Sequence, residues 1–361
     1  MPFMQALEDL LHDVGTLCSW SRHCTQPRRK PTVRVADARV RWGRANGAHF
    51  FRNGGASMHS DFVDPISQLT SELENFEEIA SYLIPKPGDL PLVRGMDIHG
   101  GTLALNGSVG GDLLIFLDFK QRFDLEARIQ DNIHKGRLDI VENLKRCQGK
   151  AGIAVVDVSG HRATDAVLAA MLHEAFLLGA IYELDMFGRV TKRLFENLNT
   201  RFYQSSAEHK FISLIYGEIS DDARFRFLSA AQPVPLVFSS RHDRFMSVSE
   251  DLCVSSPPLG MVPSFHVTDR RRTTSVLGFK DDYKMNQWVL MGEGDILLLH
   301  TDGLVEHRSA EEDYCPTHLE QKLREVKHQT AAHIFDSVKA DLLAFGKPSD
   351  DVSLVVIKRT G

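Results

Sequence analysis

Four aspartates stand in four unlike pieces of this sequence, each at the edge of an apolar run. They are Asp112 after Gly110-Gly111, Asp157 in Asp-Val-Ser-Gly-His, Asp302 in Thr-Asp-Gly and Asp350 in Ser-Asp-Asp-Val-Ser. A carboxylate is costly to bury unless it is paired or binds a metal ion, so four of them around one core indicate ligands of a hard cation. The chemistry that such a set favours is metal-assisted hydrolysis.

Each of these acids also has a plainer interpretation when taken alone. Asp157 ends an apolar run, and the carbonyl of Val158 in the following turn would add a neutral oxygen ligand; the same pattern also caps helices. Asp112 follows glycines that allow close approach of an ion or phosphate, but a simple turn fits as well. Asp350 and its neighbour Asp351 occupy a position typical of turn formers, and either one is a candidate ligand. The joint occurrence of the acids favours the metal site.

These acids must be positioned by strands and helices, and blocks of predicted strands alternate with predicted helices from about residue 92 onward. β-Branched and aromatic residues predict strands at 102–106, 112–118, 151–157, 211–219, 224–229, 234–238, 287–291, 295–301 and 352–358. Apolar periodicity predicts helices at 163–182, 188–203, 317–326 and 331–345. Helices grouped between strands, without strict alternation, predict an α+β layered sandwich with the aspartates at strand ends.

An amphipathic helix is predicted ahead of this domain. Apolar residues recur at steps of three and four between Ile66 and Leu83, after Asp64-Pro65 and before Pro85. We expect residues 58–86 to form a linker and residues 87–361 the main domain. The apolar stripe of the 66–83 helix would either pack on that domain or form a short coiled coil between two copies of the chain.

Residues 1–57 differ in character, because they are rich in arginine and show weak periodicity. A weakly ordered basic segment is the expected structure. Two alternatives are a natural start at Met58, in which case the preceding residues are not part of the natural protein, and a basic targeting arm.

Composition narrows the classes of function. The chain has 361 residues and a net charge of -6, which argues against nucleic-acid binding because no basic excess is available to neutralise phosphates. Its five cysteines are scattered without a Cys-x-x-Cys pair, so we expect a reducing compartment with neither disulfides nor a zinc site. No apolar stretch approaches the roughly 18 residues that cross a bilayer, and no secretory signal opens the chain. These features predict a soluble, cytoplasmic protein without a membrane partner.

The ordered set of motifs resembles a known family. Gly-Gly-Asp112, Asp157-Val-Ser-Gly-His161, Pro258-Leu-Gly260, Thr-Asp302-Gly-Leu-Val-Glu and Asp350-Asp-Val-Ser follow one another as in the SpoIIE/RsbU branch of the metal-dependent (PPM) serine/threonine protein phosphatases. The resemblance runs from about residue 80 to residue 361. It implies a fold of two packed antiparallel β-sheets flanked by helices, with two Mn²⁺ or Mg²⁺ ions at one end of the sandwich.

The resemblance also implies roles for residues. Asp112, Asp157, Asp302 and Asp350 match the ligating and catalytic aspartates, Val158 matches the residue that contributes a carbonyl, and Asp351 is the neighbour most easily confused with Asp350. His161 is the nearest candidate for a general acid, although a histidine in a turn is more often a local hydrogen-bond partner.

Four departures from the family pattern stand at or between these motifs. Leu113-Leu114 follows Asp112 where an aromatic residue and a second acid are usual, and Arg162 replaces a glycine. Gln232 stands in Ala-Ala-Gln-Pro where Ala-Gly-His-Pro is common. The charged segment 120–149 is longer than usual and predicts a helical insertion near the site, as a lid or a partner surface.

These features together predict a metal-dependent phosphatase that hydrolyses phosphoserine or phosphothreonine on a bacterial signalling protein similar to an anti-sigma-factor antagonist. The expected partners are that phosphorylated protein and a second copy of the chain. The alternative is a catalytically weak or inactive phosphatase-fold signalling module that binds a regulatory partner. Four crowded carboxylates favour the enzyme, because they repel one another unless a metal is bound.

Overall fold

The computed structural model describes residues 65–105, 110–160, 163–205, 210–264, 278–289, 292–309 and 312–361. All of them belong to one compact unit that spans Phe62–Gly361. The predictions for the basic segment 1–57, for a start at Met58 and for His161 and Arg162 lie outside the described residues.

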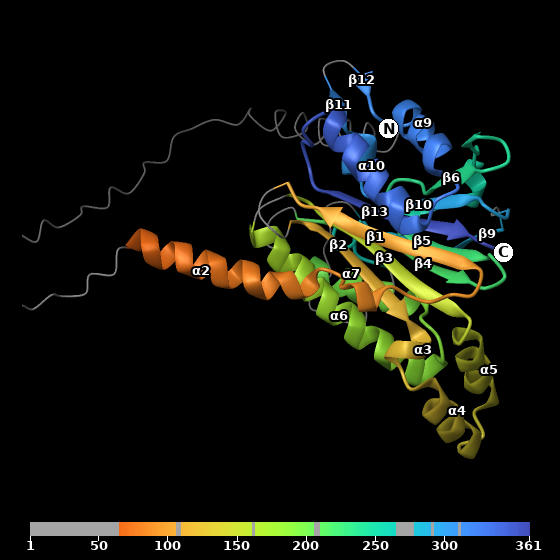
Figure 1. Ribbon diagram of the computed structural model, residues 1–361. Helices are drawn as coiled ribbons and strands as arrows, with labels where there is room; N and C mark the ends of the chain where they lie inside the picture. Colours follow the sequence, from red (N-terminus) through yellow and green to blue (C-terminus); the bar gives the residue numbers. More distant parts are fainter. Residues whose placement is uncertain are drawn as a thin grey trace, which may run out of the picture. The chain divides into compact units, whose positions relative to one another are not determined.

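Two β-sheets form the centre of this unit (Figure 1). The first sheet has the strand order β1-β13-β10-β6-β7, with bounds Met96–Leu103, Val352–Arg359, Ile296–His300, Leu236–Ser239 and Arg244–Phe245. The second has the order β2-β3-β4-β5-β8, with bounds Asp112–Asp118, Lys150–Val158, Ile212–Ser220, Phe225–Ala230 and Ser255–Ser256; β9 (Asn286–Trp288) also pairs with β5. Every pairing is antiparallel except the short contact between β5 and β8.

The two sheets pack face to face because their strands alternate inward and outward side chains. One face of each sheet contributes to a shared core that includes Phe116, Val155, Phe227, Leu299 and Val355. This arrangement confirms the predicted sandwich. The strand predicted at 102–106 is the least accurate, since β1 lies at Met96–Leu103 and only Ile98 is buried along it.

Helices cover the outer face of each sheet (Figure 1). On the second sheet lie α6 (Ala163–Phe187) and α7 (Lys192–Ser205), and on the first lie α9 (Thr317–Val326) and α10 (Ala331–Phe345). Thr330 begins α10 by accepting a hydrogen bond from the His333 backbone NH. The remaining short elements are α8 (Asp302–Val305), β11 (Arg308–Ser309), β12 (Glu312–Asp313) and a 3-10 helix at Glu250–Leu252.

The apolar character of α6 exceeds what the sequence analysis expected. By length and composition alone, Asp165–Phe187 would be able to cross a membrane, so the expectation of no such stretch was wrong. Within the described structure Leu172, Phe176 and Leu184 are fully buried in the core against the second sheet. A helix that packs on a sheet passes the same test of composition.

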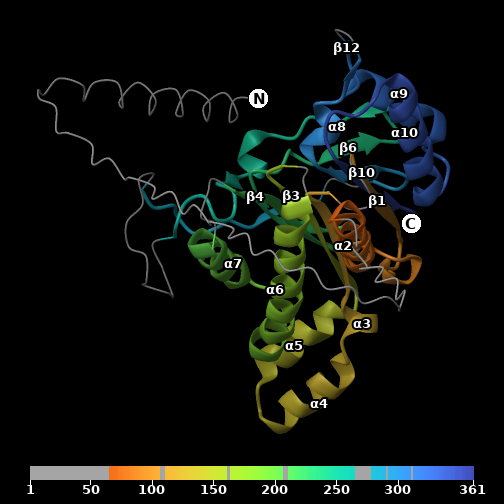
Figure 2. The ribbon, with the colours of Figure 1, turned by 90° about the vertical axis from the view of Figure 1, so that its left-hand side faces the viewer.

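The predicted linker helix is present as α2 (Pro65–Ala80), followed by 3-10 helices at Ser81–Leu83 and Pro87–Asp89. Leu83 packs against the core cluster that includes α6. Ile79, which precedes Leu83 in the stripe, is 69% exposed. Figures 1 and 2 both show the C-terminal end of α2 beside α6.

The insertion forms three helices, α3 (Phe119–Arg122), α4 (Leu125–His134) and α5 (Leu138–Cys147). It connects Asp118 to Lys150, and these residues lie at the end of the β2–β3 pair opposite to Asp112 and Asp157. Figure 2 shows α5 near the C-terminal end of α6. The prediction that the insertion lies near the candidate site was therefore wrong, because an antiparallel hairpin places its connection at the far end of both strands.

Candidate metal site

The structure brings the four predicted aspartates to one end of the sandwich. Asp112 and Asp157 are direct partners in the register of β2 and β3. Asp302 follows β10 at the start of α8, and Asp350 immediately precedes β13, the neighbour of β10. Electrostatic interactions link Asp112 with Asp157, Asp157 with Asp302, and Asp302 with Asp350.

These carboxyl groups are hard to ionise in the folded chain. Burial and then the charge of Asp157 raise the pKa of Asp112 well above its ordinary value. Burial and then the charge of Asp302 raise the pKa of Asp157 to about 7, although a hydrogen bond from Ser213 opposes the rise. Burial, followed by Glu306 and Asp350, raises the pKa of Asp302 to about 6. Among the described residues, no lysine or arginine forms an ion pair with any of these three acids, so their repulsion is uncompensated.

Hydroxyl groups from neighbouring strands orient two of the acids. Thr301 Oγ1 donates a 2.8 Å hydrogen bond to Asp112 Oδ2 and accepts one of 2.9 Å from the Ser353 backbone NH. Ser213 Oγ donates to Asp157 Oδ2 over 3.1 Å. Ser213, a single polar residue inside β4, gave no sequence signal for this role, and the motif that contains Thr301 did not reveal its contact with Asp112.

Gln232, the departure from the family pattern, belongs to the same network. Its Nε2 donates a 3.0 Å hydrogen bond to Ser213 Oγ, so it supports the hydroxyl that contacts Asp157. Its buried Oε1 has no hydrogen-bond partner among the described residues. The Gln232 side chain therefore lies directly behind the candidate site.

Asp350 and Asp351 differ sharply in their surroundings. Asp351 is 3% exposed, and its two carboxylate oxygens accept hydrogen bonds from the backbone NH groups of Leu105 (2.6 Å) and Gly111 (2.8 Å). Asp350 is exposed and accepts a 2.8 Å hydrogen bond from the Asp351 NH. Asp351 thus anchors the segment before β2, and Asp350 stays our predicted ligand of the pair.

Two glycines let this segment approach the other acids. A Cβ at Gly110 would overlap the Asp351 carboxylate, and a Cβ at Gly111 would overlap the carbonyl oxygens of Val158 and Gly160. The Val158 carbonyl, the predicted neutral ligand, therefore lies against the start of β2. The absence of a Cβ at these glycines thus admits groups of the candidate site, and close approach to an ion or phosphate stays a prediction.

The donor set fits a hard divalent cation. Carboxylate and carbonyl oxygens suit Mg²⁺ or Mn²⁺, and the uncompensated repulsion among the buried acids is what a bound cation would relieve. Within the described ranges, no group of three Asp, Glu, His or Cys side chains is close enough together to hold an ion without further ligands. Mg²⁺ usually keeps several waters and takes only one or two carboxylates directly, so a loose arrangement of acids suits it.

Comparison with known proteins places this arrangement in a family. The model of the stage II sporulation protein E (SpoIIE) family matches residues 148–360. A search of curated protein sequences found no match.

Three solved structures are similar to this chain. The structure of the RsbU and RsbW domains of a Mycobacterium tuberculosis protein has a TM-score of 0.52 at 19% identity, covering 75% of this chain and 61% of that one. The PP2C phosphatase domain with a regulatory fragment of SpoIIE from Bacillus subtilis has a TM-score of 0.51 at 16% identity, covering 73% of this chain and 64% of that one. The SiaA-PP2C domain of Pseudomonas aeruginosa has a TM-score of 0.54 at 14% identity, covering 82% and 98%.

The chain spans less than two thirds of the first two of these structures. At such low identity, the structural likenesses establish the fold alone. The family model, in contrast, covers more than half of the sequence. This chain therefore belongs to the SpoIIE family and has the fold of the PP2C-type protein phosphatases.

Proposed function

We propose that this chain is a metal-dependent protein serine/threonine phosphatase that uses two Mn²⁺ or Mg²⁺ ions. One observation carries the proposal: Asp112, Asp157 and Asp302 are drawn together in a chain of the SpoIIE family without a basic residue to balance their charge. A binding module without catalytic activity would gain nothing from this repulsion. The same observation disfavours the alternative of an inactive signalling module.

In this proposal Asp112, Asp157, Asp302, Asp350 and the Val158 carbonyl hold the ions. When bound, the ions neutralise a phosphomonoester dianion and lower the pKa of a water that attacks it. Thr301 and Ser213 keep the Asp112 and Asp157 carboxylates oriented through hydrogen bonds of 2.8 and 3.1 Å. Asp351 holds the start of β2 in place, through its contact with Gly111.

The test is release of phosphate from a phosphoserine protein by the purified chain. We expect turnover with Mn²⁺, none with EDTA, and a loss of at least about a hundredfold in Asp302→Asn, since a metal ligand is removed. Asp118→Asn is the matched control, because Asp118 ends the same strand that Asp112 begins, and its carboxylate caps α3 and accepts a hydrogen bond from the Leu92 backbone NH, away from the candidate site. Equal turnover in the wild type and Asp302→Asn would refute the proposal.

The proposed substrate is a phosphorylated bacterial signalling protein similar to an anti-sigma-factor antagonist, and the proposed compartment is the cytoplasm. Support for the substrate comes from the family and from the similar fold of a structure that contains RsbU and RsbW domains. Phosphatase assays on candidate phosphoproteins, with free phosphoserine for comparison, test the substrate class.

We also propose that α2 joins two copies of the chain. Ile79 and the adjacent Tyr82 are 69% and 70% exposed, and no described segment of the chain covers them. On α6, Leu178 and Tyr182 are 56% and 62% exposed as well. Apolar side chains at helical spacing favour a helix partner, and a second α2 has the matching stripe.

A further inference from the structure

A polar cavity of about 670 Å³ lies at the end of the second sheet opposite to the candidate metal site. Lys150 and Glu218, on β3 and β4, contribute to it, and Asp157 lies seven residue positions after Lys150 along β3. At about 3.3 Å per residue the two sites are roughly 23 Å apart. The cavity is therefore separate from the proposed phosphatase chemistry.

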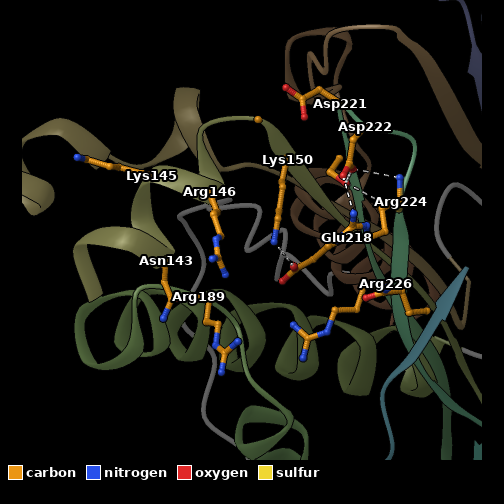
Figure 3. A pocket seen from close by; sticks show the side chains of 13 residues that line it. Asn143, Lys145, Arg146, Lys150, Arg189, Glu218, Asp221, Asp222, Arg224 and Arg226 are labelled. Atoms are coloured by element: carbon orange, nitrogen blue, oxygen red, sulfur yellow. Dashed lines mark hydrogen bonds and ion pairs between the residues drawn. The ribbon is translucent and has the colours of Figure 1, made fainter. Parts of the chain in front are cut away.

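The lining of this cavity is basic although the chain as a whole has a net charge of -6. It contains six lysines and arginines and three acidic residues: Lys145, Arg146, Lys150, Arg189, Arg224, Arg226, Glu218, Asp221 and Asp222. Figure 3 shows Arg146, Lys150, Arg189 and Arg226 grouped around Glu218, whereas Lys145 points away. These four cations come from α5, β3, the α6–α7 connection and β5, so the fold assembles them from distant parts of the sequence.

The acids of the cavity balance only part of this positive charge, and Arg146 pairs with Glu142, which is outside the lining. Glu218, which is 4% exposed, forms an ion pair of 3.4 Å with Lys150 and accepts a hydrogen bond from the Tyr216 hydroxyl. Asp222 pairs with Arg224 over 3.1 Å and accepts a hydrogen bond from Ser220, which keeps its pKa low. In the described part of the chain, Arg189 and Arg226 have neither an ion pair nor a hydrogen bond through their guanidinium groups.

We propose that this cavity binds a phosphate-bearing small molecule of about nucleotide size. Guanidinium groups that face a common space repel one another unless an anion lies between them, and their planar donors match phosphate oxygens in a bidentate manner. A volume of about 670 Å³ falls within the roughly 300–1,000 Å³ of small-molecule pockets, whereas protein partners use broader surfaces. The insertion α3–α5, whose role the phosphatase chemistry does not require, supplies one wall through Asn143 and Arg146.

Two hydrogen bonds from side chains to backbone carbonyls attach this wall to the end of α6. Asn143 Nδ2 donates a 2.9 Å hydrogen bond to the Phe187 carbonyl, and Arg137 donates to the Met186 carbonyl over 3.2 Å. Both tie α5 and its start to the end of α6, next to Arg189. The binding groups are thus held by the fold, which reduces the cost of ordering them when a ligand arrives.

The test is calorimetric titration of the full chain in EDTA at low salt, with inorganic pyrophosphate and ATP as probes. EDTA removes metal-mediated phosphate binding at the aspartates. We expect one saturable site whose affinity falls as salt is raised. Arg189→Gln and Arg226→Gln should each weaken binding by about tenfold or more, since each removes a charge-assisted bidentate contact.

Two further variants separate this inference from the proposed function. Lys145→Gln removes the same charge from a side chain that points away, so binding should change by less than about twofold. Asp157→Asn should leave probe binding intact even though it disrupts the candidate metal site. The inference is overturned if no saturable binding occurs, if Lys145→Gln and Arg226→Gln are equivalent, if Asp157→Asn abolishes binding, or if an acidic peptide binds more tightly than ATP.

Discussion

Replacing Asp157 by Asn should stabilise the metal-free protein at alkaline pH while it destroys metal binding. The pKa of Asp157 rises from its ordinary value of 3.8 to about 7 in the folded chain, because of burial and the charge of Asp302. A raised pKa means that the stability contribution of this group is fully present below about pH 4 and is lost as the pH rises through about 7. The rise corresponds to about 4 kcal/mol by pH 8, since one pKa unit is about 1.4 kcal/mol.

Asparagine removes this charge and keeps an oxygen that accepts the hydrogen bond from Ser213. In EDTA at pH 8 the variant should therefore be more stable than the wild type by up to about 4 kcal/mol. The difference should close as the pH falls below about 4, where the wild-type carboxyl becomes protonated in both states. Adding Mn²⁺ at pH 8 should raise the stability of the wild type and leave the variant nearly unchanged.

The assay is urea unfolding followed by circular dichroism at several pH values, with and without Mn²⁺. Asp118→Asn serves as the control, because Asp118 caps α3 through the NH groups of Lys120 and Gln121. The free energy of unfolding of Asp118→Asn should be lower than that of the wild type by about 1 kcal/mol at neutral and alkaline pH. A metal-free Asp157→Asn protein that is less stable than the wild type at pH 8 would refute the reasoning.

Four further substitutions test the other assignments. Asp351→Asn should lower the free energy of unfolding by about 1–3 kcal/mol, because it weakens the hydrogen bonds from the Leu105 and Gly111 backbone NH groups. Asp350→Asn should lose Mn²⁺-dependent activity with little change in stability. Identical behaviour of the two variants would contradict the assignment of Asp350 as the metal ligand. Gly111→Ala should lower both the melting temperature and the activity, since its Cβ meets the Val158 carbonyl, and a neutral outcome in both measurements would argue against that contact. Ile79→Glu should convert a dimer to a monomer in light scattering, and a monomeric wild type would exclude the proposed α2 interface.

Much of the fold was predictable because its patterns are local. β2, α9 and α10 occur at the predicted residues, since their apolar periodicity is strong. β1 was placed six residues too late, because only Ile98 is buried along this strand and its other positions lack clear alternation. The predicted position of the insertion was wrong, although the correct position could have been inferred from the predicted strands. When one acid begins a strand and another ends the next antiparallel strand, the connection between the strands lies at the end of the pair opposite to both acids.

The residues of the candidate site were also only partly predictable from the sequence. Acids at strand ends carry a sequence signal, since carboxylates beside apolar runs are unusual. Ser213 carries none, because a polar side chain within a strand becomes significant only when the register places it beside an acid. Gln232 and Thr301 stood in motifs of the sequence, but their contacts with Ser213 and Asp112 appear only in the folded chain. Arg189 and Arg226 likewise meet only in three dimensions, so the basic cavity had no signal along the chain.

The proposed function depends on the binding of metal ions by the aspartates at one end of the β-sandwich. Counting bound Mn²⁺ by electron paramagnetic resonance, in the wild type and in Asp157→Asn and Asp302→Asn, tests it most directly. The account predicts two ions bound per wild-type chain and a clear loss in each variant. A wild type that binds no Mn²⁺, or variants that bind as much as the wild type, would contradict it.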